Sequence, residues 1–219
     1  MIRCLNKAVC LNVLAGVAYF VAAWFGNLLA TQPSHASPVW PAAGVALAFM
    51  LVYGRTVIPG IFIGALIAQS FVFLSPFGTA NLLESLAVGC LTGVGAYLQA
   101  WLGMGLINRW VGHRDALIED QKIVRFFVFI ALSCLVSASV GTASLYFRGV
   151  IGHSNLANSW FTWWIGDTIG ASVFAPITLL FIGRPLSIWR VRRRLSLCCW
   201  PRKRRSAVVH HASLSARLA

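Results

Sequence analysis

The sequence predicts an all-α integral membrane protein, a polytopic bundle of about six transmembrane helices. Of its 219 residues, 58% are hydrophobic and 11% are charged, whereas soluble domains carry about 25% charged residues. The mean hydropathy is +0.77, and the apolar residues form several runs of the ~20 residues that a helix needs to cross a bilayer. The composition therefore excludes a soluble globular protein.

The first predicted span covers residues 8–30 and follows a short basic start with Arg3 and Lys7. A secretory signal peptide also starts with positive charge, but its apolar core has only ~7–15 residues. We therefore expect this helix to be retained. The second span, residues 38–53, begins at Pro38, and proline fits the first turn of a helix. It is near the lower length limit for crossing, which predicts a nearly upright helix.

The third and fourth spans are predicted at residues 57–74 and 81–107. Each contains two glycines four residues apart, a spacing that lets a second helix approach closely. The sixth span repeats this spacing. The glycines predicted to pack helices against one another are Gly44, Gly60, Gly64, Gly89, Gly93, Gly166 and Gly170.

The fifth and sixth spans carry most of the polar residues within the apolar runs. The fifth, residues 126–147, contains a stretch of small polar residues from Ser133 to Ser144. Their hydroxyl groups can bond backbone carbonyls or a facing helix, so packing accounts for them. The sixth lies within residues 160–183 and carries a carboxylate, Asp167.

The basic residues predict the topology. With the N-terminus in the cytoplasm, every Lys and Arg except Arg148 falls on the cytoplasmic side, as the positive-inside rule requires. Both termini are then cytoplasmic. The formal net charge of +13 is explained by topology and by attraction to anionic lipid. The lipid bilayer is therefore the predicted partner, and nucleic acid is not.

The chain is predicted to consist of a membrane domain, residues 1–183, and a basic cytoplasmic tail, residues 184–219, that is disordered and holds no output domain. Cys198, Cys199, His210 and His211 lie in this tail, but they lack the paired C-x-x-C spacing of a zinc site. No metal site and no cofactor are predicted. The motifs of phosphate-binding loops, hydrolases and zinc proteases are also missing, so we do not expect an enzyme.

A candidate site is indicated by two carboxylates, Glu84 and Asp167, that the spans place within the membrane. A charge there costs at least ~2.5 kcal/mol and normally faces the bundle interior or a cavity. The topology puts both in the outer half together with Arg148, and we expect the three side chains to meet. The surrounding aromatic residues are Trp40, Trp163 and Trp164. Such a set is typical of a small-molecule site, and equally of a salt-bridged structural bundle.

Two segments resemble a known family. Residues 38–48 (PVWPAAGVALA) with residues 59–65 (PGIFIGA) resemble the opening signature of the membrane-associated sensor domain of the MASE type, class one. Residues 163–170 (WWIGDTIG), followed by Ala175 and Pro176, resemble its other signature. The resemblance covers roughly residues 8–183.

This resemblance implies a bacterial inner-membrane sensory module. Such modules are usually followed by a diguanylate cyclase, phosphodiesterase, PAS or histidine kinase region. The chain departs from the family plan because the family domain is commonly longer and because no output domain is predicted in residues 184–219.

The function predicted from the resemblance is sensory. The module would perceive a small molecule or the state of the membrane and relay it to a cytoplasmic signalling partner, or act as a homo-oligomer; its ligand is unknown. Two alternatives remain open. The chain would suit the substrate-binding subunit of an uptake transporter, in which case an ATPase should co-purify, or a structural membrane subunit without a ligand.

Overall fold

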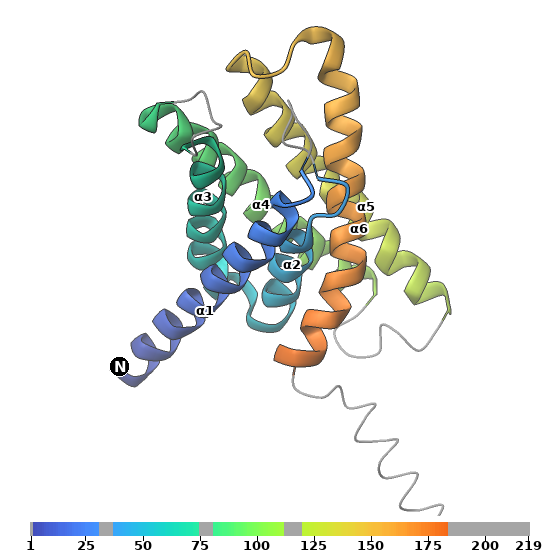
Figure 1. Cartoon of the computed structure of the whole chain (residues 1–219). Helices are drawn as coiled ribbons and strands as arrows, with labels where there is room; N and C mark the ends of the chain where they lie inside the picture. The colour runs from blue at the N-terminus through green and yellow to red at the C-terminus, as the bar shows by residue number, and fades with distance from the viewer. Residues whose placement is uncertain (1, 31–36, 75–80, 112–119, 184–219) are drawn as a thin grey trace, which may run out of the picture. The chain divides into compact units, whose positions relative to one another are not determined.

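The computed structural model describes residues 2–30, 37–74, 81–111 and 120–183. Within these ranges the chain is helical with short connections and contains no strand, which confirms the predicted all-α class (Figure 1). The helices are α1 Ile2–Asn27, α2 Pro41–Tyr53, the 3₁₀ helix η1 Gly54–Val57, α3 Ile58–Leu74, α4 Leu82–Trp110, α5 Asp120–Phe147, the 3₁₀ helix η2 His153–Asn155 and α6 Leu156–Ile182.

The chain divides into two units, Met1–Gly183 and Arg184–Ala219. The described residues all belong to the first unit. The predictions for the basic tail, including its four Cys and His residues, therefore lie outside the described residues.

Five helical stretches in the described part of the chain are long and apolar enough to cross a membrane. The second of them, Pro41–Val72, takes in α2, η1 and most of α3, which the sequence analysis treats as two spans. The chain is thus a multi-pass membrane protein. Large apolar side chains on the bundle surface fit this conclusion, such as Val17 on α1 and Phe161 on α6, each more than half exposed.

Helix α2 is the buried element of the bundle. Every residue from Pro41 to Met50 is buried, and the helix contacts α1, α4 and α6. An apolar surface on all sides is typical of a helix enclosed by others. With 13 residues at ~1.5 Å each, α2 is about 20 Å long, which is shorter than the ~30 Å hydrocarbon core.

The second helix starts later than the sequence predicts, at Pro41 rather than Pro38. Trp40 precedes a proline, which disfavours helical geometry at that residue, and its backbone has φ −114° and ψ 87°. Its N–H donates to the carbonyl oxygen of Gly166 in α6 at 2.9 Å. Residues 37–40 therefore run as non-helical chain along α6, and the proline at residue 41 occupies the first turn of α2.

A tight turn joins α2 to α3. Gly54 has φ +64° and ψ −150°, a combination that is essentially restricted to glycine. Asn12 of α1 holds the other side of this turn. Its amide donates to the Thr56 carbonyl at 2.8 Å, and its side-chain oxygen accepts from the Gly60 N–H at 2.7 Å. A free N–H in the first turn of α3 is thereby paired inside the bundle, as a lipid environment requires.

Five of the predicted packing glycines face a neighbouring helix, at three contacts. Gly60 and Gly64 of α3 face the α1 backbone, and Gly89 and Gly93 of α4 face Leu66 and Phe62 of α3. At the third contact, between α2 and α6, a Cβ atom at Gly44 would lie 2.6 Å from the Ala175 nitrogen and 2.8 Å from the Gly170 oxygen. The α2 and α6 backbones can approach here because Gly44 carries no side chain.

Candidate functional site

Asp167 lies near the middle of α6 with only 5% of its surface exposed. Its Oδ2 accepts a hydrogen bond from the hydroxyl of Ser137 in α5. The same hydroxyl lies 3.0 Å from the Cys134 carbonyl oxygen, and with one hydrogen it can donate to one of the two at a time. The Ser137 hydroxyl therefore connects Asp167 of α6 to α5.

A small pocket opens beside the carboxylate. It is lined by Ser37 and Trp40 from the segment before α2, by Gln69 of α3, and by Trp163 and Asp167 of α6. Its volume is about 20 Å³, enough for roughly one water molecule. Ser37 and Gln69 are both less than a tenth exposed, so the pocket combines one carboxylate with neutral polar groups and two indole walls.

The wall formed by residues 37–40 depends on the glycines of α6. A Cβ atom at Gly166 would overlap the Ser37 carbonyl oxygen, and one at Gly170 would overlap the Trp40 carbonyl oxygen. Besides the bond from the Trp40 N–H to Gly166, the Ser37 hydroxyl donates to the Val39 carbonyl at 2.7 Å. Non-helical backbone is tolerated at membrane depth where protein encloses it and pairs its polar groups.

A polar layer extends from Asp167 into α4 and α5. The Gln99 amide of α4 donates to the Cys134 sulfur of α5 at 3.1 Å. The hydroxyl of Thr168, next to Asp167, is also buried and interacts with the Cys134 thiol of α5. Polar groups from α4, α5 and α6 thus meet where the apolar sequence predicts only packing.

The α6 tryptophans lie on different sides of the site. Trp163 lines the pocket and packs over Gly141 of α5, where a Cβ atom would overlap its ring. Trp164 instead donates from Nε1 to the Ala131 carbonyl at 2.9 Å. It also stacks on Trp160, with ring centroids 6.1 Å apart and ring planes 19° apart. Trp164 therefore fixes α6 to α5 and does not line the pocket.

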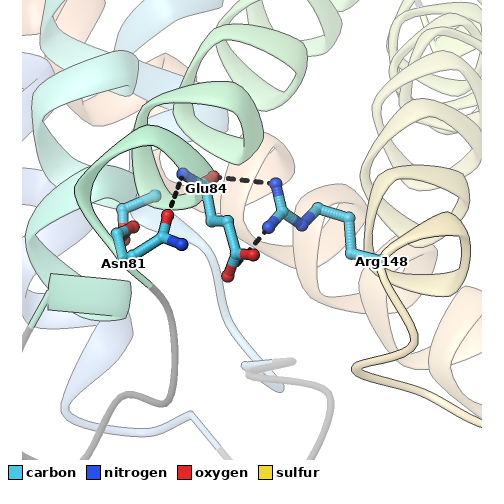
Figure 2. Close-up of polar contacts among 4 residues, drawn as sticks. Asn81, Glu84 and Arg148 are labelled. Carbon is cyan, nitrogen blue, oxygen red and sulfur yellow. Dashed lines mark hydrogen bonds and ion pairs between the residues drawn. The ribbon is translucent and has the colours of Figure 1, made fainter.

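Glu84 and Arg148 form a separate pair at the ends of two other helices. Figure 2 shows the Arg148 guanidinium against Glu84, with Nη2 3.1 Å from Oε2 and Nη1 donating to the Glu84 carbonyl at 3.2 Å. The Asn81 side chain caps α4 by accepting from the Glu84 N–H at 3.0 Å. The two charged side chains are 43% and 22% exposed. A pair this exposed contributes only ~0–1 kcal/mol to stability.

Of the three residues expected to meet, Glu84 and Arg148 pair with each other, whereas the Asp167 carboxylate bonds Ser137. Glu84 lies in the first turn of α4 and Arg148 directly follows α5, whereas Asp167 is roughly 16 Å along α6 from its first residue. Asp167 therefore lies deeper in the bundle than the Glu84–Arg148 pair. The structure brings Glu84 to Arg148, and it brings Asp167 to Trp40 and Trp163.

A second, larger cavity lies between α5 and α6. It is an open groove of about 550 Å³. Its lining residues are Ser139, Thr142, Ala143, Tyr146, Phe147, Leu156, Ala157, Trp160 and Phe161. None of them carries a charge, so of the two cavities the Asp167 pocket is the one with a charged group. Among the described residues no three His, Cys, Asp or Glu side chains gather as a metal site would require.

Comparison with family models decides the affiliation. The MASE1 family model matches residues 10–202, most of the chain. The chain belongs to the MASE1 family. Comparison with curated proteins and with solved structures gives no match. The predicted resemblance to the class-one membrane-associated sensor domain is confirmed, and the MASE1 match continues past residue 183, where the sequence analysis ends the membrane domain.

In this MASE1 chain three residues at or beside the pocket are not predicted from the sequence: Gln69, Ser137 and Ser37. Gln69 is a polar residue inside an apolar run, the same signal that identifies Asp167. Ser137 belongs to the small polar stretch of the fifth span, which the sequence explains by packing alone. Ser37 lies between two predicted spans, and no sequence signal indicates that its side chain is buried in the bundle.

Proposed function

We propose that this chain is a sensory module of a bacterial inner membrane, with the Asp167 pocket as its sensing site. MASE1 membership supports a sensory role. The observation that carries the choice of site is the buried Asp167 carboxylate, which contacts Ser137 of α5 while its own helix supports residues 37–40 before α2. A ligand that alters this carboxylate therefore acts on contacts between helices.

The relay follows from the position of α6. This helix packs on α2 and α5 and is the last described helix of the chain, so a cytoplasmic output domain or partner would be reached through the residues that follow it. Two arrangements of α6 against α5 would differ in whether Ser137 donates to Asp167 or to the Cys134 carbonyl. A ligand that prefers one arrangement shifts their populations. A homo-oligomer would carry the same shift to a second copy.

The test uses the full chain with a diguanylate cyclase domain fused after Ala219. Linkers that differ in length by one residue at a time, over one helical turn, should be compared. The result then does not depend on how the linker orients the cyclase relative to α6. We expect Asp167→Asn to change cyclic dinucleotide output, because it keeps the shape and removes the charge. A hydrogen bond to a charged group contributes ~1.5–3 kcal/mol, so the ratio of the two states should change about tenfold or more.

The matched control is Glu84→Gln, which neutralises the more exposed carboxylate of the Arg148 pair. We expect its output to equal that of the parent fusion. If Asp167→Asn accumulates normally in the membrane and its output also equals the parent value for every linker, the pocket is not the sensing site. Co-purification of an ATPase with the unfused chain would instead favour the transporter alternative.

A further inference from the structure

We infer that the ligand of the Asp167 pocket is a single monovalent cation, either a proton or an alkali metal ion. This inference rests on the proposed function, since it names what the sensing site binds. It follows from three properties of the pocket: its size, its net charge and the chemistry of its walls.

Size excludes organic ligands from the pocket as it stands. Sites for small organic molecules usually measure ~300–1,000 Å³, whereas this pocket has about 20 Å³. The wall formed by residues 37–40 packs directly on the glycines of α6, which restrains the pocket from widening on that side. A water-sized particle fits, and an alkali cation or a protonated water molecule is of that size.

Charge selects a monovalent cation. Among the described residues that line the pocket, Asp167 is the one ionisable side chain, and none of them is a Lys, Arg or His. A buried charge is costly unless it is neutralised. One positive charge neutralises this carboxylate, while a divalent ion would leave an uncompensated positive charge in an apolar bundle.

The walls suit a cation. Carboxylate, amide and hydroxyl oxygens, which hard cations prefer, are available from Asp167, Gln69 and Ser37. The indoles of Trp40 and Trp163 complete the lining, and tryptophan is the side chain that attracts cations best through its ring face. The described lining of the pocket thus offers one carboxylate with neutral groups of favourable polarity.

The binding test uses the indoles as reporters. The full chain is purified into nanodiscs of zwitterionic phosphatidylcholine, which carry no surface charge of their own. Tryptophan fluorescence is then recorded while sodium or potassium chloride replaces choline chloride at constant ionic strength. We expect a saturable change with an alkali cation and none with choline, complete loss of the change in Asp167→Asn, and its retention in Glu84→Gln.

A pH titration in choline alone separates the two cations. Tyr19 of α1 and Cys134 of α5 are the titratable groups of neighbouring helices that interact electrostatically with Asp167, so the titration is repeated in Tyr19→Phe and Cys134→Ala. A pH transition that survives both substitutions, vanishes in Asp167→Asn and is unaffected by sodium or potassium identifies the proton. A response to sodium or potassium at fixed pH identifies the alkali ion.

Ser137→Ala distinguishes a positioning role from a structural one. Because the Ser137 hydroxyl stabilises the free carboxylate, its removal should make Asp167 bind a cation about tenfold more tightly, whereas simple structural damage would weaken binding. If neither cation changes the fluorescence of folded protein, the inference is wrong even if the cyclase fusion responds to Asp167→Asn. Cation binding without any cyclase response would leave the inference intact and overturn the proposed function.

Discussion

At Gly170 of α6 a single hydrogen takes the place of a side chain because the Trp40 carbonyl lies against it. We expect Gly170→Ala to destabilise the chain, since overpacking costs ~1–3 kcal/mol. For a chain of this size the thermal midpoint should fall by roughly 2–12 °C, measured on purified protein in detergent.

Gly105 of α4 provides the matched control. A Cβ atom there meets nothing within 4 Å, and alanine is favoured over glycine in a helix by ~1 kcal/mol. Gly105→Ala should therefore leave the midpoint unchanged or raise it. A Gly170→Ala protein as stable as the Gly105→Ala protein would contradict the close contact between α6 and residues 37–40.

At the residue scale, the sequence predicts a functional position where residues follow a known spacing or where a polar residue interrupts an apolar run. Gly166 and Gly170 follow such a rule, and Asp167 is a carboxylate in an apolar run. The role of Gly141 is not readable in this way, because it depends on which way the Trp163 ring turns in the folded bundle. The position of Arg148 beside Glu84 rather than Asp167 depends on depths along three helices, and a count of residues gives those depths only once the helix starts are known.

At the scale of elements, the reversal between α2 and α3 depends on one amide in α1. Asn12 bonds both the Thr56 carbonyl and the Gly60 N–H. We expect Asn12→Ala to destabilise this reversal by ~1–3 kcal/mol, because it removes two hydrogen bonds that typically contribute ~0.5–1.5 kcal/mol each. Denaturant titration in mixed micelles measures the change.

The same substitution at an exposed asparagine is the control. Asn158 lies near the start of α6 with its side chain exposed, so Asn158→Ala should change stability by no more than ~0.5 kcal/mol. Equal effects of the two substitutions would show that the amide of Asn12 does not hold the turn.

The apolar runs of the sequence predict that each helix exists, whereas the residue at which a helix begins or ends depends on local chemistry. All six predicted spans overlap an α-helix of the described chain. The start of α2 differs from its prediction because two local preferences compete. Proline is acceptable at Pro38 as a first helical residue, but Trp40 before Pro41 prefers extended backbone, and its N–H pairs with Gly166. The pairing partner lies more than a hundred residues away in the sequence, so no local pattern reports it.

At the scale of the whole membrane domain, α2 is too short to cross the bilayer as a helix alone. It covers about 20 Å, less than the ~30 Å hydrocarbon core. Residues 37–40, directly before it, already lie inside the bundle, since the Trp40 N–H pairs with Gly166 near the middle of α6. We therefore expect residues 37–40 and α2 to form one crossing together.

This arrangement predicts that η1 reaches the cytoplasmic surface and that the chain crosses the membrane six times. Thr56 of η1 and Ser154 of η2 are both exposed. In a background without cysteine, Thr56→Cys and Ser154→Cys place one thiol at each end of the bundle. A membrane-impermeant maleimide should label Ser154→Cys in intact cells and Thr56→Cys only in inverted vesicles, since the positive-inside rule puts Arg55 in the cytoplasm.

The competing topology makes a different prediction for the same two thiols. If Pro41–Val72 crossed as one continuous helical stretch, Thr56 would lie near the bilayer centre and its thiol would react from neither side. Five crossings would then place the two ends of the domain on opposite sides of the membrane. Labelling of Thr56→Cys in inverted vesicles therefore requires the reversal at Gly54, whose backbone geometry is open to glycine and closed to other residues. Unlabelled Thr56→Cys in both preparations, beside labelled Ser154→Cys, would overturn the six-span topology.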